Sequence, residues 1–497
     1  MPLVTRTPTH VLTLLCITLT LLLLSVTACT SGLSKQPFSL QVVGRNFANV
    51  IVKVNKNKPL VSSNFSPGMT STNTSLFDPW EGNNHAAVQS AMGLISHGLS
   101  FVNVHIMAWG AEDPWPDPSK SEPDNWESLD RKMQLALSTN TISVITLCEA
   151  PWWMKGRLNA DGSTTLLTSD DDFGEIAYES RILDNKMDAW LKLVQRVAER
   201  YMVAPYNVRY FQVWNEFKGY YNPMTNNWDV STSPGDPSGP NATHGYTYMY
   251  NRVYTTLKAV ASEKGIDPAA IKVGGPYATM DTLSSVSQSH PSSLSRPYGV
   301  FDQRSLNEVT YWLKNKVGAD FITVDGSDKN DDGIAKTDAF TATEKFADVV
   351  TWIRSLDERI YPGAKTLPIW WAEWYADPAS LAARASDNAV KSYAMIQLIK
   401  AGGSVALAWD SAALWTPTAR SGGGQPLAWY YSYKAFKDDF GPGTIIYRTS
   451  VSSSQVEVLA SPRKTMLVNK TDQTLSVAFD TVIVTLTPYQ VSVIDTP

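Results

Sequence analysis

The feature that most constrains this chain is a regular alternation of short apolar runs and longer amphipathic segments between about residues 60 and 415. The apolar runs have the length and the β-branched or aromatic content of strands buried on both faces. They are Leu60–Asn64, Phe101–Met107, Ser143–Cys148, Val208–Trp214, Ile271–Gly274, Phe321–Val324, Pro368–Ala372 and Val405–Trp409. Apolar residues at helical spacing mark the segments between them, most clearly Met187–Tyr201, Asn251–Lys264 and Ser386–Ala401.

This order predicts an α/β chain with a (β/α)₈ barrel over residues 60–420. A doubly wound sheet is the competing arrangement, but no glycine-rich phosphate loop follows the first strand. After Tyr430 the pattern changes to β-type alternation. We therefore expect a small C-terminal antiparallel β-sandwich over residues 425–497, completed by N-terminal strands at 37–59.

The N-terminus has the pattern of an export signal rather than of a fold element. Arg6 precedes an almost unbroken apolar run over residues 11–26, and Val26-Thr27-Ala28-Cys29 resembles a bacterial lipobox. Residues 1–28 are then a lipoprotein signal peptide, Cys29 is lipidated, and residues 29–36 are a tether. The expected location is the bacterial cell envelope, with a lipid anchor in a membrane; an uncleaved anchor or ordinary secretion is the alternative.

The remaining composition excludes several classes of function. The formal charge of −5 and the pI near 5.8 show no footprint of nucleic-acid binding. If Cys29 is lipidated and Cys16 is removed, Cys148 remains alone, so neither an internal disulfide nor a cysteine-rich metal site is expected. The oligomeric state cannot be read from these data.

Two of the predicted strands end in a glutamate. The run Val208 to Trp214 continues into Asn215-Glu216, and the run from Pro368 continues through Trp371 and Ala372 to Glu373. A buried strand rarely ends in a lone carboxylate that has neither a partner nor a function. Residues at the C-terminal ends of barrel strands line the active site, and Glu216 and Glu373 end the fourth and seventh strands. Paired carboxylates are what cleavage of a glycosidic bond requires.

These residues carry a resemblance to a known group. Trp214-Asn215-Glu216 on the fourth strand, with a glutamate ending the seventh, resembles the retaining glycoside hydrolases of clan A. Within that clan the chain is similar to family 39, which includes β-xylosidases, α-iduronidases and some exopolysaccharide endoglycosidases. Val273-Gly274-Gly275-Pro276, Asp320-Phe321-Ile322 and the terminal β-domain are similar too, so that the likeness covers most of residues 60–497.

The resemblance implies a role for each matching position. Glu216 is the acid/base and Glu373 the nucleophile. Asn215 binds the sugar hydroxyl next to the anomeric carbon. His105, at the end of the second strand, lines the site, and Trp409, at the end of the eighth, stacks on sugar.

Two positions depart from the family pattern. Phe217 follows the Asn-Glu pair where the family usually has proline. The sixth strand continues into Val324-Asp325-Gly326 rather than into a histidine and an aromatic residue. These changes leave the catalytic pair intact and bear on the substrate. Asp325 is predicted to bind hydroxyls or a cationic sugar.

Aromatic residues gather at the predicted strand ends, where their faces can pack on the C–H faces of sugars. They are Trp109, Trp115, Trp152, Trp153, Trp228, Trp374, Tyr375, Trp409 and Trp415. Of these we predict substrate contacts for Trp109, Trp152, Trp374, Tyr375 and Trp409, and some of the others belong to the core.

No metal or organic cofactor is expected, because the chemistry of the glutamate pair needs none. The segment Asp328 to Gly333 partly matches a calcium loop, but position twelve is Ala339 rather than glutamate. A solvated acidic loop is the better interpretation.

The sequence thus predicts a retaining O-glycoside hydrolase that cleaves poly- or oligosaccharide by double displacement at the cell envelope. Two alternatives remain open. One is a non-catalytic carbohydrate-binding lipoprotein on a decayed barrel, and the other is a transglycosylase in exopolysaccharide assembly. Sugar, linkage, anomer and exo or endo action are not encoded in any pattern that we can read.

Overall fold

The computed structural model describes residues 49–72, 84–376, 385–410, 414–479 and 482–496. Residues from Ala48 onward form one compact unit. The expected signal peptide, the tether and Cys29 lie outside the described residues. No helix in the described ranges combines the length and the apolar character that are needed to cross a membrane.

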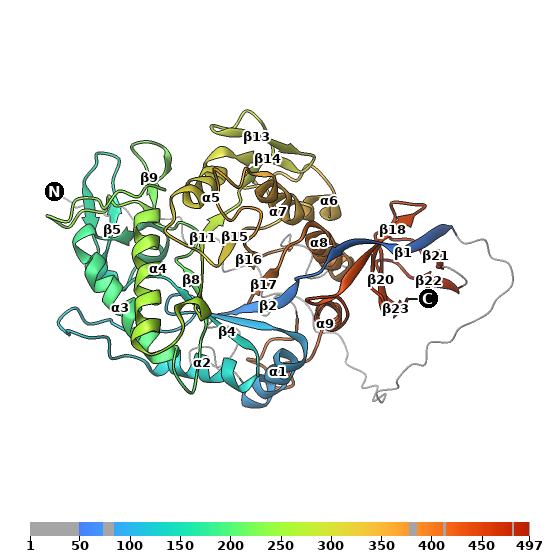
Figure 1. The fold of residues 1–497 in the computed structure, drawn as a ribbon, viewed down its shortest axis with the longest axis horizontal. Coiled ribbons are helices and arrows are strands. Elements are labelled where there is room, and N and C mark those ends of the chain that lie inside the picture. The colour runs from blue at the N-terminus through green and yellow to red at the C-terminus, as the bar shows by residue number, and fades with distance from the viewer. Residues whose placement is uncertain (1–48, 73–83, 377–384, 411–413, 480–481, 497) are drawn as a thin grey trace, which may run out of the picture. The chain divides into compact units, whose positions relative to one another are not determined.

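Eight parallel strands close into a barrel, which confirms the predicted fold class (Figure 1). In chain order they are β2 (Ser66–Ser71), β3 (Phe101–His105), β4 (Ile142–Leu147), β8 (Tyr210–Val213), β11 (Lys272–Thr279), β15 (Phe321–Asp325), β16 (Ile369–Trp374) and β17 (Val405–Trp409). The first strand was predicted wrongly. Leu60 belongs to the long strand β1 (Val50–Ser62), which pairs with the terminal sheet, and the barrel begins four residues after Ser62.

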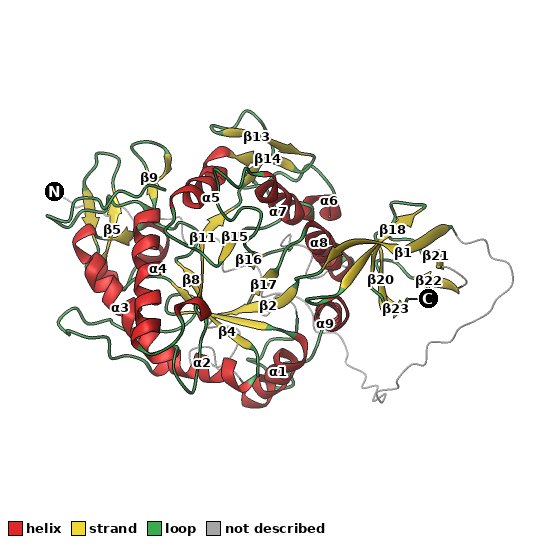
Figure 2. Ribbon diagram, viewed as in Figure 1, coloured by secondary structure: helices red, strands yellow, loops and turns green. Residues whose placement is uncertain are grey.

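Helices surround the strands, as Figure 2 shows in red around yellow. They are α1 (His85–Gly98), α2 (Glu127–Ser138), α3 (Met187–Tyr201), α4 (Tyr246–Glu263), α5 (Gln303–Asn315), α6 (Ala339–Thr343), α7 (Lys345–Ser355), α8 (Asp387–Ala401) and α9 (Ala428–Phe440). The apolar stripe of α3 is buried, including Trp190 and Val194. Helix α8 ends where Gly402 takes a left-handed conformation, φ 88°.

The barrel interior is filled by side chains in layers. Tyr210, Phe321 and Trp370 form an aromatic layer with Phe101, in which the Phe321 and Trp370 rings stack with centroids 4.1 Å apart. Toward the C-terminal ends the next layer is polar. Asn103 accepts a hydrogen bond from the Thr146 hydroxyl at 2.8 Å, and Gln212 donates to the same hydroxyl at 3.0 Å. This polar layer forms the floor beneath the carboxylates that follow.

A second sheet contains both ends of the described chain. Its order is β22 (Val482–Leu486), β21 (Leu475–Phe479), β1, β18 (Ile445–Val451), β19 (Val456–Ala460), β20 (Lys464–Asn469) and β23 (Val491–Asp495). All neighbours pair antiparallel except β1 and β21. Residues of β1, β19, β20, β21 and β22 share one apolar core, so the two halves of the sheet face one another as in a sandwich.

The boundary at residue 425 needs correction. Helix α9 lies within the range assigned to the β-domain, yet it packs against α1, α8 and β2 of the barrel. The Tyr433 hydroxyl bonds the carbonyls of Gly68 and Ala406, each at 2.7 Å. Because α9 covers the first and last barrel strands, the C-terminal strands of the second sheet begin only at Ile445.

Short hairpins extend the loops after the barrel strands. After β4 come β5 (Lys155–Leu158), β6 (Thr164–Leu166) and β7 (Arg181–Ile182), and after β8 come β9 (Tyr221–Asn222) and β10 (Asn227–Trp228). After β11 come β12 (Thr282–Leu283), β13 (Pro291–Arg296) and β14 (Gly299–Asp302). These insertions lie at the C-terminal ends of strands, where a barrel carries its site.

Candidate active site

Glu216 lies in a tight turn that directly follows β8. Trp214, Glu216 and Phe217 all have positive φ, at 69°, 50° and 53°. Such conformations are costly for residues other than glycine and persist only where the surroundings enforce them. Here Trp214 packs edge-on against Trp190 of α3, and Phe217 stacks on Tyr246 of α4 with ring centroids 4.0 Å apart. Phe217, the departure from the family pattern, is therefore a buried anchor of the turn that presents Glu216.

Glu373 enters the site through an irregularity in β16. The pairing of β16 with β17 shifts register between Trp371 and Trp374, which is the mark of a β-bulge. Trp370 faces the barrel interior, and simple alternation from it would point Glu373 outward. The bulge re-aims the strand, so that Glu373 turns inward and Trp374 packs outward against Phe346 and Trp429.

The two glutamates meet, and a third carboxylate joins them. One carboxylate oxygen each of Glu216, Asp325 and Glu373 lie within 4.8 Å of one another. Lys218 forms an ion pair with Glu216, and its Nζ also donates to Asn215 Oδ1 at 2.7 Å. The neighbouring carboxylates raise the pKa of Lys218 even though burial opposes this, so the lysine is the resident cation of the cluster.

Glu373 is surrounded by hydrogen-bond donors. Asn215 Nδ2 donates to Oε1 at 3.0 Å, the Tyr277 hydroxyl donates to Oε1 at 2.8 Å, and the Tyr375 hydroxyl donates to Oε2 at 2.6 Å. Burial and then the charge of Glu216 raise the pKa of Glu373 to about 8, although Lys218 and the two tyrosines oppose that rise. The three donors stabilise the anion that nucleophilic attack requires, against the effect of burial.

Asp325 has the opposite surroundings. It is fully buried, and neither of its oxygens meets a hydrogen-bond donor in the described part of the chain. Burial, followed by the charges of Glu373 and Glu216, raises its pKa well above the ordinary range. Among the three carboxyl groups the proton is therefore best placed on Asp325, directly beside Glu216.

His105 lies at the end of β3 with Nε2 3.7 Å from Glu373 Oε1. Burial and the charge of Lys218 lower its pKa to about 3, so the imidazole is neutral near pH 7. Its Nδ1 has no partner among the described residues. The Trp409 ring lies 5.8 Å from the His105 ring and 6.2 Å from the Tyr375 ring. Stacking of Trp409 on a sugar stays a prediction.

The predicted aromatic residues divide between the site and the core. Trp109 covers Lys218, whose Nζ is 4.2 Å from the ring centroid, and Trp152 is half-buried at the end of β4. The prediction for Trp374 is wrong, because the bulge in β16 turns its ring into the helical layer. Trp115 and Trp415 are buried in the core.

Sequence reasoning missed two residues that contact the pair. Tyr277 follows the predicted strand Ile271–Gly274, and it reaches Glu373 because β11 shifts register between Pro276 and Ala278. Lys218 stands two positions after Glu216, a spacing that the turn converts into contact. A lysine two positions after a predicted catalytic carboxylate could have been predicted to lie in the site.

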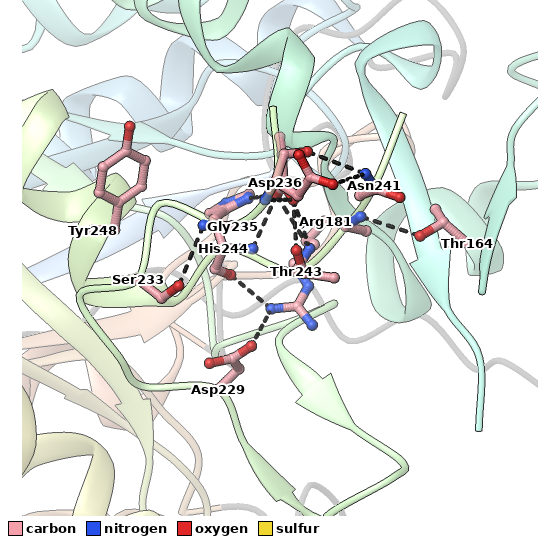
Figure 3. Close-up of polar contacts among 12 residues, drawn as sticks. Thr164, Arg181, Asp229, Ser233, Gly235, Asp236, Asn241, Thr243, His244 and Tyr248 are labelled. Carbon is pink, nitrogen blue, oxygen red and sulfur yellow. Dashed lines mark hydrogen bonds and ion pairs between the residues drawn. The ribbon is translucent and has the colours of Figure 1, made fainter. Parts of the chain in front are cut away.

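A polar cluster holds the loop that leaves the Glu216 turn. Asp184 accepts hydrogen bonds from the Thr243 hydroxyl at 2.6 Å and from His244 Nδ1 at 2.8 Å, as well as from backbone amides. His244 Nε2 lies 2.9 Å from the Tyr220 hydroxyl, four residues beyond Glu216. The guanidinium of Arg181 donates to Asp229 at 3.0 Å and to the His244 carbonyl at 2.8 Å (Figure 3).

Among the described residues, the carboxylates of Glu216, Asp325 and Glu373 lie close enough together to hold a metal ion. Lys218 already supplies a cation to Glu216, and the donors around Glu373 occupy the lone pairs that a metal would use. The arrangement fits proton transfer and nucleophilic attack better than metal binding. In the Asp328–Gly333 segment, Asn330 donates to the carbonyls of Tyr298 and Ile334, each at 2.8 Å.

Comparison with known proteins gives likeness in structure but not in sequence. No protein-family model and no curated protein matches the chain. SrfJ from Salmonella typhimurium is similar with a TM-score of 0.53 at 12% identity, over 89% of this chain and 92% of that chain. A monomeric β-xylosidase from Caulobacter crescentus has a TM-score of 0.49 at 14% identity, over 84% and 76%. A GH39 enzyme from Xanthomonas axonopodis pv. citri has 0.48 at 12%, over 84% and 74%. The likeness to SrfJ concerns the fold alone.

Proposed function

We propose that the chain is a retaining O-glycoside hydrolase that acts on poly- or oligosaccharide. The observation that carries this proposal is the meeting of Glu216 and Glu373, whose carboxylate oxygens come within 4.8 Å at the ends of the fourth and seventh barrel strands. Retaining enzymes hold their two carboxyl groups about 5–5.5 Å apart, whereas inverting enzymes leave about 6.5–9.5 Å for a water. The short spacing favours double displacement.

In the first step Glu373 attacks the anomeric carbon, and the bond from that carbon to the leaving oxygen breaks. Glu216 donates its proton to the leaving oxygen. In the second step a water attacks the same carbon, Glu216 takes the water proton, and Glu373 leaves as a carboxylate. The donors from Asn215, Tyr277 and Tyr375 hold Glu373 in place for attack.

Glu216, the ion-pair partner of Lys218, needs a proton before the first step. Asp325 meets this need, because its buried carboxyl has a raised pKa and lies beside Glu216. A proton can pass from Asp325 to Glu216, because one carboxylate oxygen of each lies within 4.8 Å of the other. Binding alone does not require two carboxylates at the distance that retaining enzymes use, and the pair therefore disfavours the non-catalytic alternative.

The test is Glu373→Ala with external azide, monitored by product analysis on a panel of glycans. We expect turnover to fall by at least about 10⁴-fold, and azide to restore it with a glycosyl azide of opposite anomeric configuration. Glu263→Ala, on the exposed end of α4, is the matched control and keeps full activity. Unchanged turnover in Glu373→Ala, or an inverted product from the unmodified chain, would refute the proposal.

Membership of clan A with the motif of family 39, and attachment to the bacterial envelope, belong to the same proposal. The support for both is the sequence: the Asn215-Glu216 and Val273–Pro276 motifs, and the lipobox that ends at Cys29. Cys29→Ala should move the protein from the membrane fraction to the soluble fraction after expression in bacteria. Retention in membranes would contradict the lipid anchor without affecting the catalytic proposal.

A further inference from the structure

A cavity of about 620 Å³ opens over the ends of β3 and β4. Its walls include residues directly after β3, such as Trp109, and residues directly after β4, such as Trp152. Trp109 is also the residue that covers Lys218 of the carboxylate cluster. A pocket of this size, on the C-terminal face of a barrel, has room for a sugar ring beside the reacting one.

The aromatic part of the cavity suits a sugar. Trp109 and Phe173 meet edge to face with ring centroids 5.4 Å apart, and both line the cavity together with Trp152. Phe173 is 46% exposed, which is unusual for a large apolar side chain and leaves its ring open to a ligand. Aromatic faces at the wall of an open pocket pack well on C–H groups.

The polar part of the cavity is acidic. Its carboxylates are Glu112, Asp113, Glu149 and Asp170, and no Lys, Arg or His is among its described lining residues. Asp113 and Asp170 are close enough for the charge of Asp170 to help raise the pKa of Asp113 to about 7, after the larger effect of burial. These carboxylates repel one another when they are ionised, and a cationic ligand would relieve that repulsion.

Glu149 supplies a second, independent observation that points to a ligand in this cavity. It is fully buried, and its Oε2 forms an ion pair with Lys155. Its Oε1 has no hydrogen-bond donor in the described ranges. An unsatisfied buried carboxylate oxygen costs stability unless a ligand donor reaches it. No three carboxylates of this cavity lie close enough together to hold a metal ion among the described residues, so separate donors fit better.

We propose that this cavity is a subsite for a cationic amino sugar, and that the substrate is a polysaccharide with free amino groups. This inference rests on the proposed glycosidase function and specifies its substrate class. The aromatic walls would pack on the ring, and Asp113 with Asp170 would receive the ammonium group. A neutral sugar offers the same carboxylates only hydroxyl donors, which leave the negative charge uncompensated.

The test compares chitosan tetraose with cellotetraose, which share β-1,4-linked six-membered rings and differ in the amino group. Calorimetric titration uses the full-length Glu373→Ala variant at pH 6 and 0.15 M salt, so that neither probe is consumed. We expect chitosan tetraose to bind at least about 10-fold more tightly, a difference that corresponds to one charge-assisted contact. Equal affinity for the two probes would overturn the proposal.

Variants localise the effect within the chain. Asp113→Asn with Asp170→Asn should bring the two affinities within about two-fold of each other, chiefly by weakening chitosan tetraose. Asp495→Asn, in the terminal sheet and 88% exposed, is the matched control and should preserve the difference. A preference for chitosan tetraose that survives the double substitution would show that the cationic site lies elsewhere.

Proton release on binding distinguishes direct contact of Asp113 with the ligand from a purely structural role of this residue. At pH 6 Asp113 is largely protonated in the free protein, because burial and the charge of Asp170 raise its pKa to about 7. An arriving ammonium group favours the carboxylate, so binding should release protons, measured as a dependence of heat on buffer ionisation. Burial also raises the pKa of Glu149, in the same cavity, to about 7, so Glu149 can release protons as well. Asp113→Asn should reduce the release, and a release that is unchanged in the variant would contradict the assignment.

Failure of this inference is distinguishable from failure of the proposed function. Hydrolysis of neutral glycans without preference for chitosan tetraose would leave the glycosidase intact and remove the cationic subsite. Tight binding of chitosan tetraose to a chain that hydrolyses no glycan would keep the subsite and remove the catalysis.

Discussion

Two buried aspartates of this barrel have opposite surroundings. Asp184 accepts hydrogen bonds from a hydroxyl, an imidazole and three backbone amides, whereas Asp325 meets no donor among the described residues. Asp184 holds together the loop that starts at the Glu216 turn. Asp325 lies against Glu216 itself. A buried carboxylate whose hydrogen bonds are satisfied stabilises the fold, whereas one without donors is available for a proton or a ligand.

The largest effect on stability is expected at Asp184. Asp184→Ala leaves the donors of His244 and Thr243 without an acceptor inside the protein. Loss of a buried, fully paired carboxylate costs about 3–5 kcal/mol, which chemical denaturation measures as a lower free energy of unfolding. Asp188→Asn, on α3 with a 93% exposed side chain, is the control and should change it little. A change below about 1 kcal/mol in Asp184→Ala would remove the contrast between the two aspartates.

Asp325→Asn should lower turnover and leave stability intact, in contrast to Asp184→Ala. The free energy of unfolding should stay constant or rise, because a buried carboxyl without donors is replaced by a neutral amide. Turnover should fall about 100-fold, close to 2.7 kcal/mol, since Glu216 loses its proton source. The alkaline limb of the pH–rate profile should move to lower pH, because the cluster then holds its proton less tightly. Full activity with a lowered stability would assign Asp325 to the fold instead.

The pH dependence of stability should show a smaller effect of Asp184 at acid pH. Burial works to raise the pKa of Asp184, but hydrogen bonds from His244 and Thr243 outweigh it and lower the pKa to about 2. A depressed carboxyl pKa contributes stability above the unfolded value near 4, and this contribution is lost as pH falls toward 2. The unmodified chain should lose about 2 kcal/mol through this group over that interval. In Asp184→Ala the slope of stability against pH should be correspondingly shallower.

Much of this architecture could be predicted from the sequence. The periodicity of apolar residues and the polar residues at the ends of predicted strands are both visible in short stretches of the chain. The strand at Val405–Trp409 and the helix at Met187–Tyr201 were predicted with the observed bounds. Leu60 was misplaced because β1 is one long strand that bends with register shifts, and its apolar end looks like a separate strand. The wrong prediction for Trp374 and the absence of Tyr277 have one cause. Each depends on a register shift in a barrel strand, which is set by pairing with distant residues.

The hydrogen-bond surroundings of a buried carboxylate cannot be predicted from sequence patterns. Asn215, Glu216 and Glu373 were found from strand ends, but nothing in the residues around Asp325 says that its oxygens lack donors. That property is the sum of everything packed around it. The same holds for Asp184, which was not singled out at all, since its donors come from Asp236, Thr243 and His244 far along the chain.

The smallest predicted effect tests whether the donors around Glu373 matter for catalysis. Tyr375→Phe removes the hydroxyl that donates to Oε2 at 2.6 Å and leaves the ring beside Trp409. We expect a fall of about 10-fold in kcat/KM, near 1.4 kcal/mol, because Glu373 is a less stable anion with one donor fewer. Tyr393→Phe is the matched control, since its hydroxyl donates to Glu344 at the same 2.6 Å in the helical layer. If both variants kept full activity, the donors would serve packing alone, and the contrast between Glu373 and the donor-free Asp325 would lose its catalytic meaning.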